Sequence, residues 1–307
     1  MKPLIVIVGP TAVGKTAAAI RLAERIDGEI VSADSRQIYR HMDIGTAKPS
    51  AEQRVRVPHH LIDVVDPDEA FSLAQYQSAA YAAIDDIFAR GKQPLLVGGT
   101  GLYVKAVSEG LRIPAVPPHP DLRAELEAQA ASSGGKYALY AELQRVDPVA
   151  AARIDPRNVR RTIRALEVHR LSGERFSELG RSQPPAYRVM TLGLTRPRSE
   201  LYARIDARID TMIAAGLVEE TRRLAQRYDW SLPSMSGLGY RQIGMFLRGE
   251  CGLAEAIAAI RRDSRRFVRR QANWFRVLDP RIRWLETRID VDKDVLTILQ
   301  GETDGVE

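Results

Sequence analysis

The 307-residue sequence contains one cysteine, Cys251, and no run of eighteen or more apolar residues. A single cysteine excludes an intramolecular disulfide and a zinc site built from several cysteines. The absence of a long apolar run leaves no candidate transmembrane helix, and the first residues lack the shape of a signal peptide. These absences predict a cytoplasmic protein that does not enter a membrane.

Lysine is scarce as well, because only seven of the 45 basic residues are lysines, and the formal net charge is +6. Arginine binds phosphate through a planar pair of donors and stacks on bases, so an arginine excess suits a polyanionic partner. A general bias of the genome toward arginine codons would give the same composition. The positions of the arginines along the chain therefore have to distinguish the two explanations.

Short apolar runs alternate with longer helical patterns in the first hundred residues. Strands are expected at residues 4–8, 29–32, 95–97 and 189–194, with helices at 14–25 and 72–90. This alternation predicts an α/β fold with a parallel sheet core and helices on both faces. Because ligands of such sheets bind at the carboxyl ends of the strands, the segments after the first three strands should form one site.

The middle of the chain has a different character, since the pattern turns helical between two proline-rich stretches at 113–120 and 183–185. We expect an all-helical subdomain over 114–188. It would be inserted into an α/β catalytic domain formed by 1–113 and 189–290, and residues 291–307 are predicted to be a tail.

Residues 9–16 read Gly-Pro-Thr-Ala-Val-Gly-Lys-Thr and match the P-loop pattern in full, between an expected strand and an expected helix. Backbone N–H groups of such a loop and the start of the helix can surround a diphosphate. Lys15 is expected to reach the terminal phosphate oxygens, and the Thr16 hydroxyl to bind Mg²⁺. The residues expected to bind the diphosphate here are Gly9, Thr11, Ala12, Val13, Gly14, Lys15 and Thr16.

Asp34 follows the second expected strand and should lie over this phosphate site. Its carboxylate could bind Mg²⁺, take a proton as general base, or only cap a helix. An ordinary P-loop ATPase also needs a carboxylate at the end of a later strand. Residues 95–97 instead run into Gly98-Gly99-Thr100. This argues against an ATPase and leaves a P-loop small-molecule kinase as the alternative.

Several segments together resemble the tRNA dimethylallyltransferases, also called tRNA isopentenyltransferases. In chain order the matching segments are 9–16, 32–39, 42–49, 57–63, 98–103, 164–168, 239–242 and 270–275. A P-loop alone is common, whereas this ordered set is specific. The resemblance implies transfer of a dimethylallyl group from dimethylallyl diphosphate to N6 of the tRNA adenosine at position 37, next to the anticodon on its 3′ side. The products would be N6-dimethylallyladenosine and diphosphate.

The resemblance also implies roles for individual residues. Asp34 matches the family's catalytic aspartate, and Thr100 matches a threonine that contacts the reacting nucleotide. Thr16 with Mg²⁺ is expected to neutralise charge on the departing diphosphate. A further cation for the diphosphate is expected from Arg204 or Arg208, which share a helix face at a spacing of four residues, and Arg208 is the preferred candidate.

The anticodon stem-loop of tRNA is the expected macromolecular partner. Clustered arginines in the insertion predict contact with the RNA backbone, and the site candidates among them are Arg160, Arg161 and Arg164. Contacts to bases, by stacking and amide hydrogen bonds, are expected from Gly239, Tyr240, Arg241 and Gln242. Around the catalytic aspartate, the tRNA-binding candidates are Asp34, Ser35, Arg36, Gln37 and Thr100.

A long helix is expected at 253–276, and the chain from residue 198 onward is predicted to be helical. The apolar stripe of the long helix predicts core packing, and its arginine-rich flank either lines the RNA groove or pairs with acidic neighbours. A kinase would not need the basic insertion, and a nucleotide-switched RNA-binding module would need residues that sense a γ-phosphate. Prenyl transfer explains the P-loop, the missing strand-end carboxylate and the basic insertion together. The resemblance further implies a monomer.

Overall fold

The computed structural model describes residues 3–114, 116–179 and 182–287. In these residues six strands form one sheet, in the order β3-β2-β4-β1-β5-β6, and every neighbouring pair is parallel. The strands are β1 Pro3–Val8, β2 Gly28–Ser32, β3 His59–His60, β4 Gln93–Val97, β5 Arg188–Thr195 and β6 Ile282–Glu286. The predicted parallel α/β sheet is confirmed.

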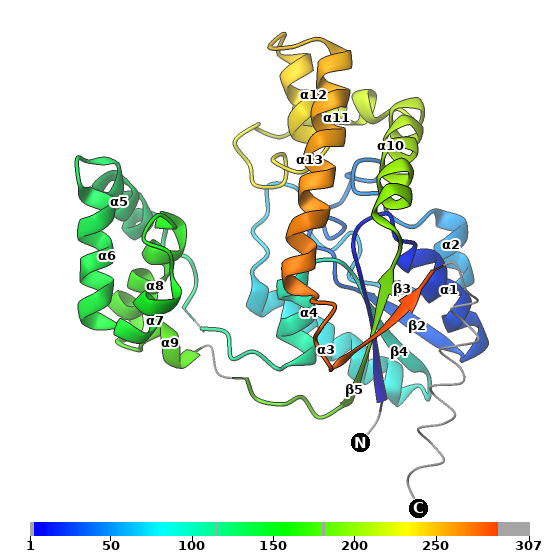
Figure 1. Cartoon of the computed structure of the whole chain (residues 1–307), viewed down its shortest axis with the longest axis horizontal. Helices are drawn as coiled ribbons and strands as arrows, with labels where there is room; N and C mark the ends of the chain where they lie inside the picture. Colours follow the sequence, from blue (N-terminus) through cyan, green and yellow to red (C-terminus); the bar gives the residue numbers. More distant parts are fainter. Residues whose placement is uncertain (1–2, 115, 180–181, 288–307) are drawn as a thin grey trace, which may run out of the picture. The chain divides into compact units, whose positions relative to one another are not determined.

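Both faces of the sheet are buried, as the inner strand β1 shows, because its side chains alternate between two hydrophobic cores. Ile5 and Ile7 of β1 belong to one hydrophobic core, whereas Leu4, Val6 and Val8 belong to the other. Alternate side chains of a strand point to opposite faces, so a strand covered on both sides is apolar at every position. Helices therefore cover both faces of the sheet, as predicted (Figure 1).

The helices divide between the two cores. The first core packs α1 Lys15–Arg25, α10 Arg198–Ala214, α11 Leu217–Ala225, α12 Tyr240–Leu247 and α13 Leu253–Trp274 against the sheet. The second core packs α3 Leu73–Ala89 and α4 Gly101–Ser108. A short helix, α2 Ala51–Arg56, precedes β3. In the described part of the chain, no helix has the length and apolar character needed to cross a membrane.

Two strands escaped the sequence analysis. β3 has only two residues, and it is held in part by His60, whose Nε2 lies 2.7 Å from Glu29 Oε2 on β2. β6 corrects the prediction that the chain is helical from residue 198 onward. Ile282 and Trp284 of β6 pack against the second core, so apolar side chains alternate along this strand. The alternation covers only a few residues and was overlooked after the long arginine-rich helix.

The chain separates into two compact units, one of which comprises residues 109–185. This unit contains α5 Pro120–Ala131, α6 Gly135–Val146, α7 Pro148–Arg153, α8 Val159–Ser172 and α9 Phe176–Leu179. Its helices pack around their own apolar core, centred on Leu126, Leu139 and Leu166. The chain enters and leaves it through an antiparallel bridge between Leu111 and Ser182, which puts residues 109–113 with the insertion. The predicted tail, 291–307, lies outside the described residues.

Gly98, directly after β4, is the tightest of the contacts that position the site. A Cβ at this residue would lie 2.1 Å from the backbone oxygen of Ala33, and backbone cannot yield as a side chain can. We expect Gly98→Ala to lower the free energy of unfolding by about 3 kcal/mol, the upper range for overpacking. Urea unfolding would measure it, with Gly252→Ala as the matched control.

At Gly252 a Cβ would meet only a side-chain oxygen at 3.6 Å, and φ is −74°. The control substitution should therefore cost less than about 1 kcal/mol. Equal losses in the two variants would contradict the close approach at Gly98.

Candidate active site

The P-loop connects β1 to α1 in a conformation that depends on glycine. Gly9 has φ 147° and Gly14 has φ 110°, both in the region that L side chains rarely adopt. A Cβ at Gly9 would also lie 2.6 Å from the Leu194 oxygen of β5. Val13, fully buried in the first core, fixes the middle of the loop to the protein interior. The loop therefore exposes backbone at the start of α1, where the helix dipole favours an anion.

Lys15, the first residue of α1, folds back over this loop. Its Nζ donates hydrogen bonds to the backbone oxygens of Gly9 and Pro10, each at 2.9 Å. Burial lowers the pKa of Lys15 to about 8, although the carboxylate of Asp34 opposes the shift and the charge of Arg208 adds to it. Lys15, Asp34 and Arg208 thus lie close enough to influence one another.

Both candidate arginines of α10 reach the P-loop. Arg204 Nε donates to the Ala12 oxygen at 2.9 Å, and Arg208 Nη1 lies 3.5 Å from Thr11 Oγ1. Arg204 is exposed and Arg208 is half-buried. Burial lowers the pKa of Arg208, while Asp34 raises it. The structure therefore brings three cations to one loop, with Arg208 the deeper of the two arginines.

Asp34 lies at the carboxyl end of β2, in a turn that Thr100 holds in place. The carboxylate accepts a hydrogen bond from the Arg36 N–H at 2.8 Å. Thr100 Oγ1 accepts from the Ser35 N–H at 3.0 Å, and the Thr100 N–H donates to the Ala33 oxygen at 3.1 Å. Thr100 follows β4, so two neighbouring strand ends are connected directly beside the carboxylate.

The next two residues of this turn bind the protein itself. Arg36 Nη1 donates to the Pro233 oxygen at 2.7 Å. Gln37 Nε2 donates to the oxygens of Thr46 and Ala47, and Ser32 Oγ donates to Gln37 Oε1. Both ends of the Gln37 amide are thus used to hold the turn, and a tRNA contact of Ser35 or Arg36 stays a prediction.

Glu220 of α11 was not singled out from the sequence, although it anchors the segment that Gln37 holds. It is 3% exposed, and its carboxylate accepts hydrogen bonds from the N–H groups of Asp43, Ile44 and Gly45. A fourth hydrogen bond comes from the hydroxyl of Tyr240 at 2.7 Å. A buried carboxylate is stable only when donors surround it in this way.

Two of the residues predicted to read bases, Tyr240 and Gln242, have buried side chains that bind the protein itself, and a tRNA contact of these residues stays a prediction. Each is 1% exposed. The Tyr240 ring fills the space at Gly45, where a Cβ would come within 2.5 Å of it. Gln242 Nε2 binds Asp263 Oδ2 at 2.9 Å, and Gln242 Oε1 caps α12 at the N–H of Gly239. Only Arg241 is exposed here, and it pairs with Asp263.

Gln271 of α13 is a second residue that the sequence analysis did not select for the site. It is 4% exposed, although it lies at the P-loop. The Thr11 N–H donates to Gln271 Oε1 at 2.8 Å, and Gln271 Nε2 donates to the Gly99 oxygen at 3.0 Å. The sequence did contain a signal for this role, since Gln271 is a polar residue within an apolar helical stripe. A buried amide needs hydrogen-bond partners, so such a residue is expected to bind other parts of the protein.

The predicted tRNA-binding arginines of α8 divide into two kinds. Arg160 and Arg161 are exposed, and their side chains form no ion pair or hydrogen bond with other residues in the described ranges. Arg164 instead binds the buried carboxylate of Glu167 at 2.5 Å and the Val116 oxygen at 2.7 Å. The Arg164 guanidinium thus holds the proline-rich entry segment within the insertion, and its contact with tRNA stays a prediction.

The arginine flank of α13 pairs in part with acidic neighbours, one of the two expectations for it. Arg261 binds Asp210 and Arg265 binds Asp206, both on α10, at 2.5 Å. The apolar stripe is buried at Ile260, but Trp274 is 45% exposed, so core packing does not account for the whole helix.

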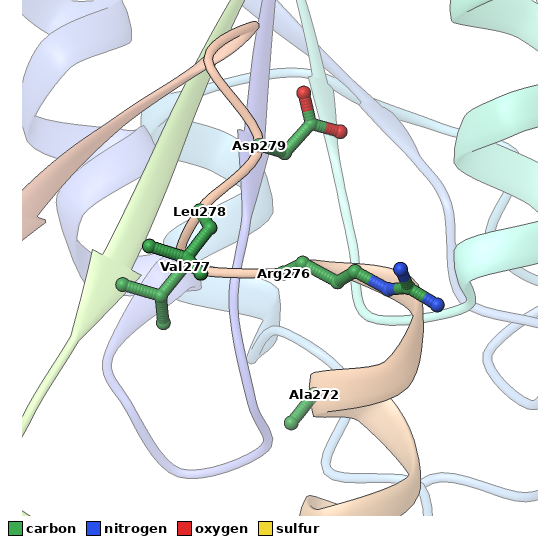
Figure 2. A pocket seen from close by; sticks show the side chains of 5 residues that line it. All are labelled: Ala272, Arg276, Val277, Leu278 and Asp279. Carbon is green, nitrogen blue, oxygen red and sulfur yellow. The ribbon is translucent and has the colours of Figure 1, made fainter.

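A recess follows α13, lined by Ala272, Arg276, Val277, Leu278 and Asp279 (Figure 2). The side chain of Arg276 extends away from those of Val277 and Leu278 (Figure 2). Val277 and Leu278 are strongly exposed. None of the predicted site residues lines this recess, so it is distinct from the candidate active site.

No group of three or more His, Cys, Asp or Glu side chains in the described ranges could hold a metal ion by itself. Mg²⁺ commonly binds through one or two protein oxygens together with substrate phosphates and water. The Thr16 hydroxyl at the start of α1 fits this mode, since the P-loop beside it can hold phosphates. The residues present therefore suit a metal that arrives with a diphosphate.

Comparisons with known proteins agree with this geometry. The family model described as IPP transferase matches residues 37–277, and one described as isopentenyl transferase matches residues 2–61. A tRNA dimethylallyltransferase of Roseiflexus castenholzii is 61% identical over 279 residues, which is 91% of each chain. One from a further Roseiflexus species is 57% identical and covers 99% of this chain and 100% of its own. The chain belongs to the tRNA dimethylallyltransferase family.

Solved structures of this family support the fold. The tRNA isopentenylpyrophosphate transferase of Bacillus halodurans is 43% identical, with a TM-score of 0.72, and covers 99% of this chain and 96% of its own. A eukaryotic dimethylallyltransferase acting on tRNA has a TM-score of 0.80 at 27% identity, covering 93% of this chain and 74% of its own. Family membership removes the basis for the kinase alternative.

Because burial lowers the pKa of Lys15 to about 8, its charge is present below that pH and is lost above it. Binding of inorganic pyrophosphate should therefore weaken by about tenfold between pH 7 and pH 9, beyond any effect of the ionisation of pyrophosphate itself. Isothermal calorimetry would measure this, with Lys15→Arg as the comparison that stays charged. A constant ratio of the two affinities across this range would contradict the shifted pKa.

Burial alone would raise the pKa of Glu167, but hydrogen bonds from Arg123, the His119 N–H and Arg164 lower it to about 2. The stabilisation is therefore present above the ordinary pKa of about 4.5 and is lost as the pH falls toward 2. Glu167→Gln should destabilise the insertion by on the order of 2 kcal/mol at pH 6. Hydrogen exchange of α8 in the full chain would show this difference shrinking at pH 3, whereas a pH-independent difference would refute it.

Proposed function

We propose that this protein transfers a dimethylallyl group from dimethylallyl diphosphate to N6 of adenosine 37 in tRNA. One observation supports this most: the carboxylate of Asp34 lies within electrostatic reach of Lys15 and Arg208, and β4, the strand beside the P-loop strand, runs into Gly98-Gly99-Thr100 and not into a carboxylate. A cradle for an anionic leaving group and a base beside it are what such a transfer requires.

The reaction forms a bond between adenine N6 and C1 of the dimethylallyl group, while the bond from C1 to the diphosphate oxygen breaks. The bonding electrons leave with the diphosphate, so cations have to stabilise a growing negative charge. In our proposal the P-loop N–H groups, Lys15, Arg204 and Arg208 receive that charge. Arg208 is more buried than Arg204, and the charge of Asp34 raises its pKa, so we assign Arg208 the larger share.

Adenine N6 is a weak nucleophile, so it benefits from a base that takes its proton as the new bond forms. We assign this role to Asp34. Its carboxylate is fixed by the Arg36 N–H, and Thr100 holds the adjoining Ser35. We assign Thr100 to the same end of the site, where its hydroxyl would contact the reacting nucleotide.

Mg²⁺, when bound with the donor, would neutralise charge on the diphosphate, and the Thr16 hydroxyl is the protein oxygen that we assign to it. We assign contact with the RNA backbone to Arg160 and Arg161 on the insertion, because they are exposed and form no ion pair with other described residues. Salt should weaken such contacts steeply. A monomer active in the cytoplasm stays part of the proposal.

The deciding experiment is incubation of unmodified tRNA with Mg²⁺ and dimethylallyl diphosphate labelled in the prenyl group. Wild-type protein should move label into tRNA at adenosine 37. Asp34→Asn keeps the size of the side chain and removes its basicity, so we expect kcat to fall by about 10² to 10⁴.

One control makes the assay specific, and two outcomes would change the proposal. Substitution of adenosine 37 by guanosine in the tRNA should abolish labelling by the wild type. Transfer of the γ-phosphate of ATP to a small molecule, with no label in tRNA, would overturn the proposal. Equal rates for wild type and Asp34→Asn would retain the enzyme class and remove Asp34 as base.

A further inference from the structure

Gln271 connects two loops that carry different halves of the proposed reaction. One is the P-loop, where the Thr11 N–H donates to Gln271 Oε1 at 2.8 Å. The other is the loop after β4, where Gln271 Nε2 donates to the Gly99 oxygen at 3.0 Å. The three residues are far apart in sequence, so α13 provides a cross-link that neither loop could form by itself.

The side chain of Gln271 and the backbone of Gly99 are in close contact. A Cβ at Gly99 would lie 2.4 Å from Gln271 Nε2 and 3.5 Å from Lys15 Nζ. Gly99, the amide of Gln271 and the amine of Lys15 therefore meet at one point. The absence of a side chain at residue 99 is what allows the amide to approach the backbone.

The connection continues from Gly99 to Asp34. Thr100 follows Gly99 directly, donates its N–H to the Ala33 oxygen, and accepts from the Ser35 N–H. Ala33 and Ser35 are the two neighbours of Asp34 in the chain. A displacement at Gly99 is therefore passed to the carboxylate through two hydrogen bonds, one on each side of Asp34.

We infer that Gln271 is a positioning residue that sets the distance between the diphosphate-binding loop and the turn that carries Asp34. This inference rests on the proposed function. An amide is suited to the task because one end accepts while the other donates, and both partners here are backbone groups. Without the Gln271 amide, the Thr11 N–H and the Gly99 oxygen would lose their hydrogen-bond partners. Each loop would then shift to satisfy its free backbone group.

Gln271→Met tests the role, because methionine keeps the length of the side chain and forms neither hydrogen bond. A misplacement of about 1 Å can slow a reaction by about 100-fold, and we expect kcat for tRNA prenylation to fall by about that factor. KM for both substrates and the Kd of inorganic pyrophosphate should change less than about threefold, since the amide holds the loops and not the substrates.

Gln93→Met is the matched control. Gln93 Nε2 donates to the backbone oxygens of Pro3 and Pro94 at 2.9 and 3.0 Å, at the amino end of β4. This variant loses two comparable hydrogen bonds at the opposite end of the sheet, and its kcat should stay within about twofold of the wild type.

Gly99→Ala provides an independent perturbation. Its new Cβ would displace the side-chain amide of Gln271, although residue 271 itself is unchanged. It should reproduce the loss of kcat, and the double variant should be no slower than either single variant. If Gln271→Met does not fold, Gly99→Ala decides the question by the same two criteria.

The outcomes separate cleanly. An unchanged kcat in a folded variant overturns the inference. So does a pyrophosphate Kd that rises as far as kcat falls, because the residue would then serve the diphosphate directly. A wild type that binds pyrophosphate but never labels tRNA would instead overturn the proposed function.

Discussion

The site depends on one pairing arrangement, in which β4 lies between β1 and β2 and is parallel to both. Val97, the last residue of β4, is opposite Ile7 of β1 and Ser32 of β2. Parallel strands in this register end at the same level, so the P-loop, Asp34 and Thr100 begin from one edge of the sheet. Segments separated by ninety residues of sequence thereby become neighbours through the backbone hydrogen bonds of the sheet, and the glycines after β4 allow them to touch.

The sequence was informative where a local rule applies. The P-loop, the first strands and Asp34 follow from spacing and from the strand ends, because each depends on residues close together in the chain. Gln271 and Glu220 could not be assigned partners in this way, since their hydrogen bonds join residues far apart in sequence. The burial of Tyr240 and Gln242 could not be foreseen for the same reason. The residue types that bind bases also form hydrogen bonds within a protein core. Only the surroundings of a residue distinguish a base contact from a structural one.

Charge was a less reliable guide than topology. The arginine excess suggested a polyanionic partner, yet Arg164, Arg261 and Arg265 are bound by carboxylates of the protein itself. An arginine that already has a bidentate or buried partner has little to offer RNA. The useful signal is therefore an exposed arginine that pairs with no other described residue, such as Arg160. The pairing of the other arginines can be recognised only once the helices are packed.

The order of the strands has a consequence for synthesis of the protein. β1, the first strand to leave the ribosome, pairs on one side with β5, and Pro3 is opposite Arg188. At about 5–20 residues per second, the chain between them takes roughly 10–40 s to make. During that interval the backbone N–H and C=O groups on one edge of β1 lack their partners in β5, while the helical insertion, whose contacts are local, can already fold. The nascent enzyme thus acquires its appendage before its catalytic sheet is complete, and this is the stage at which a chaperone would be of most use to it.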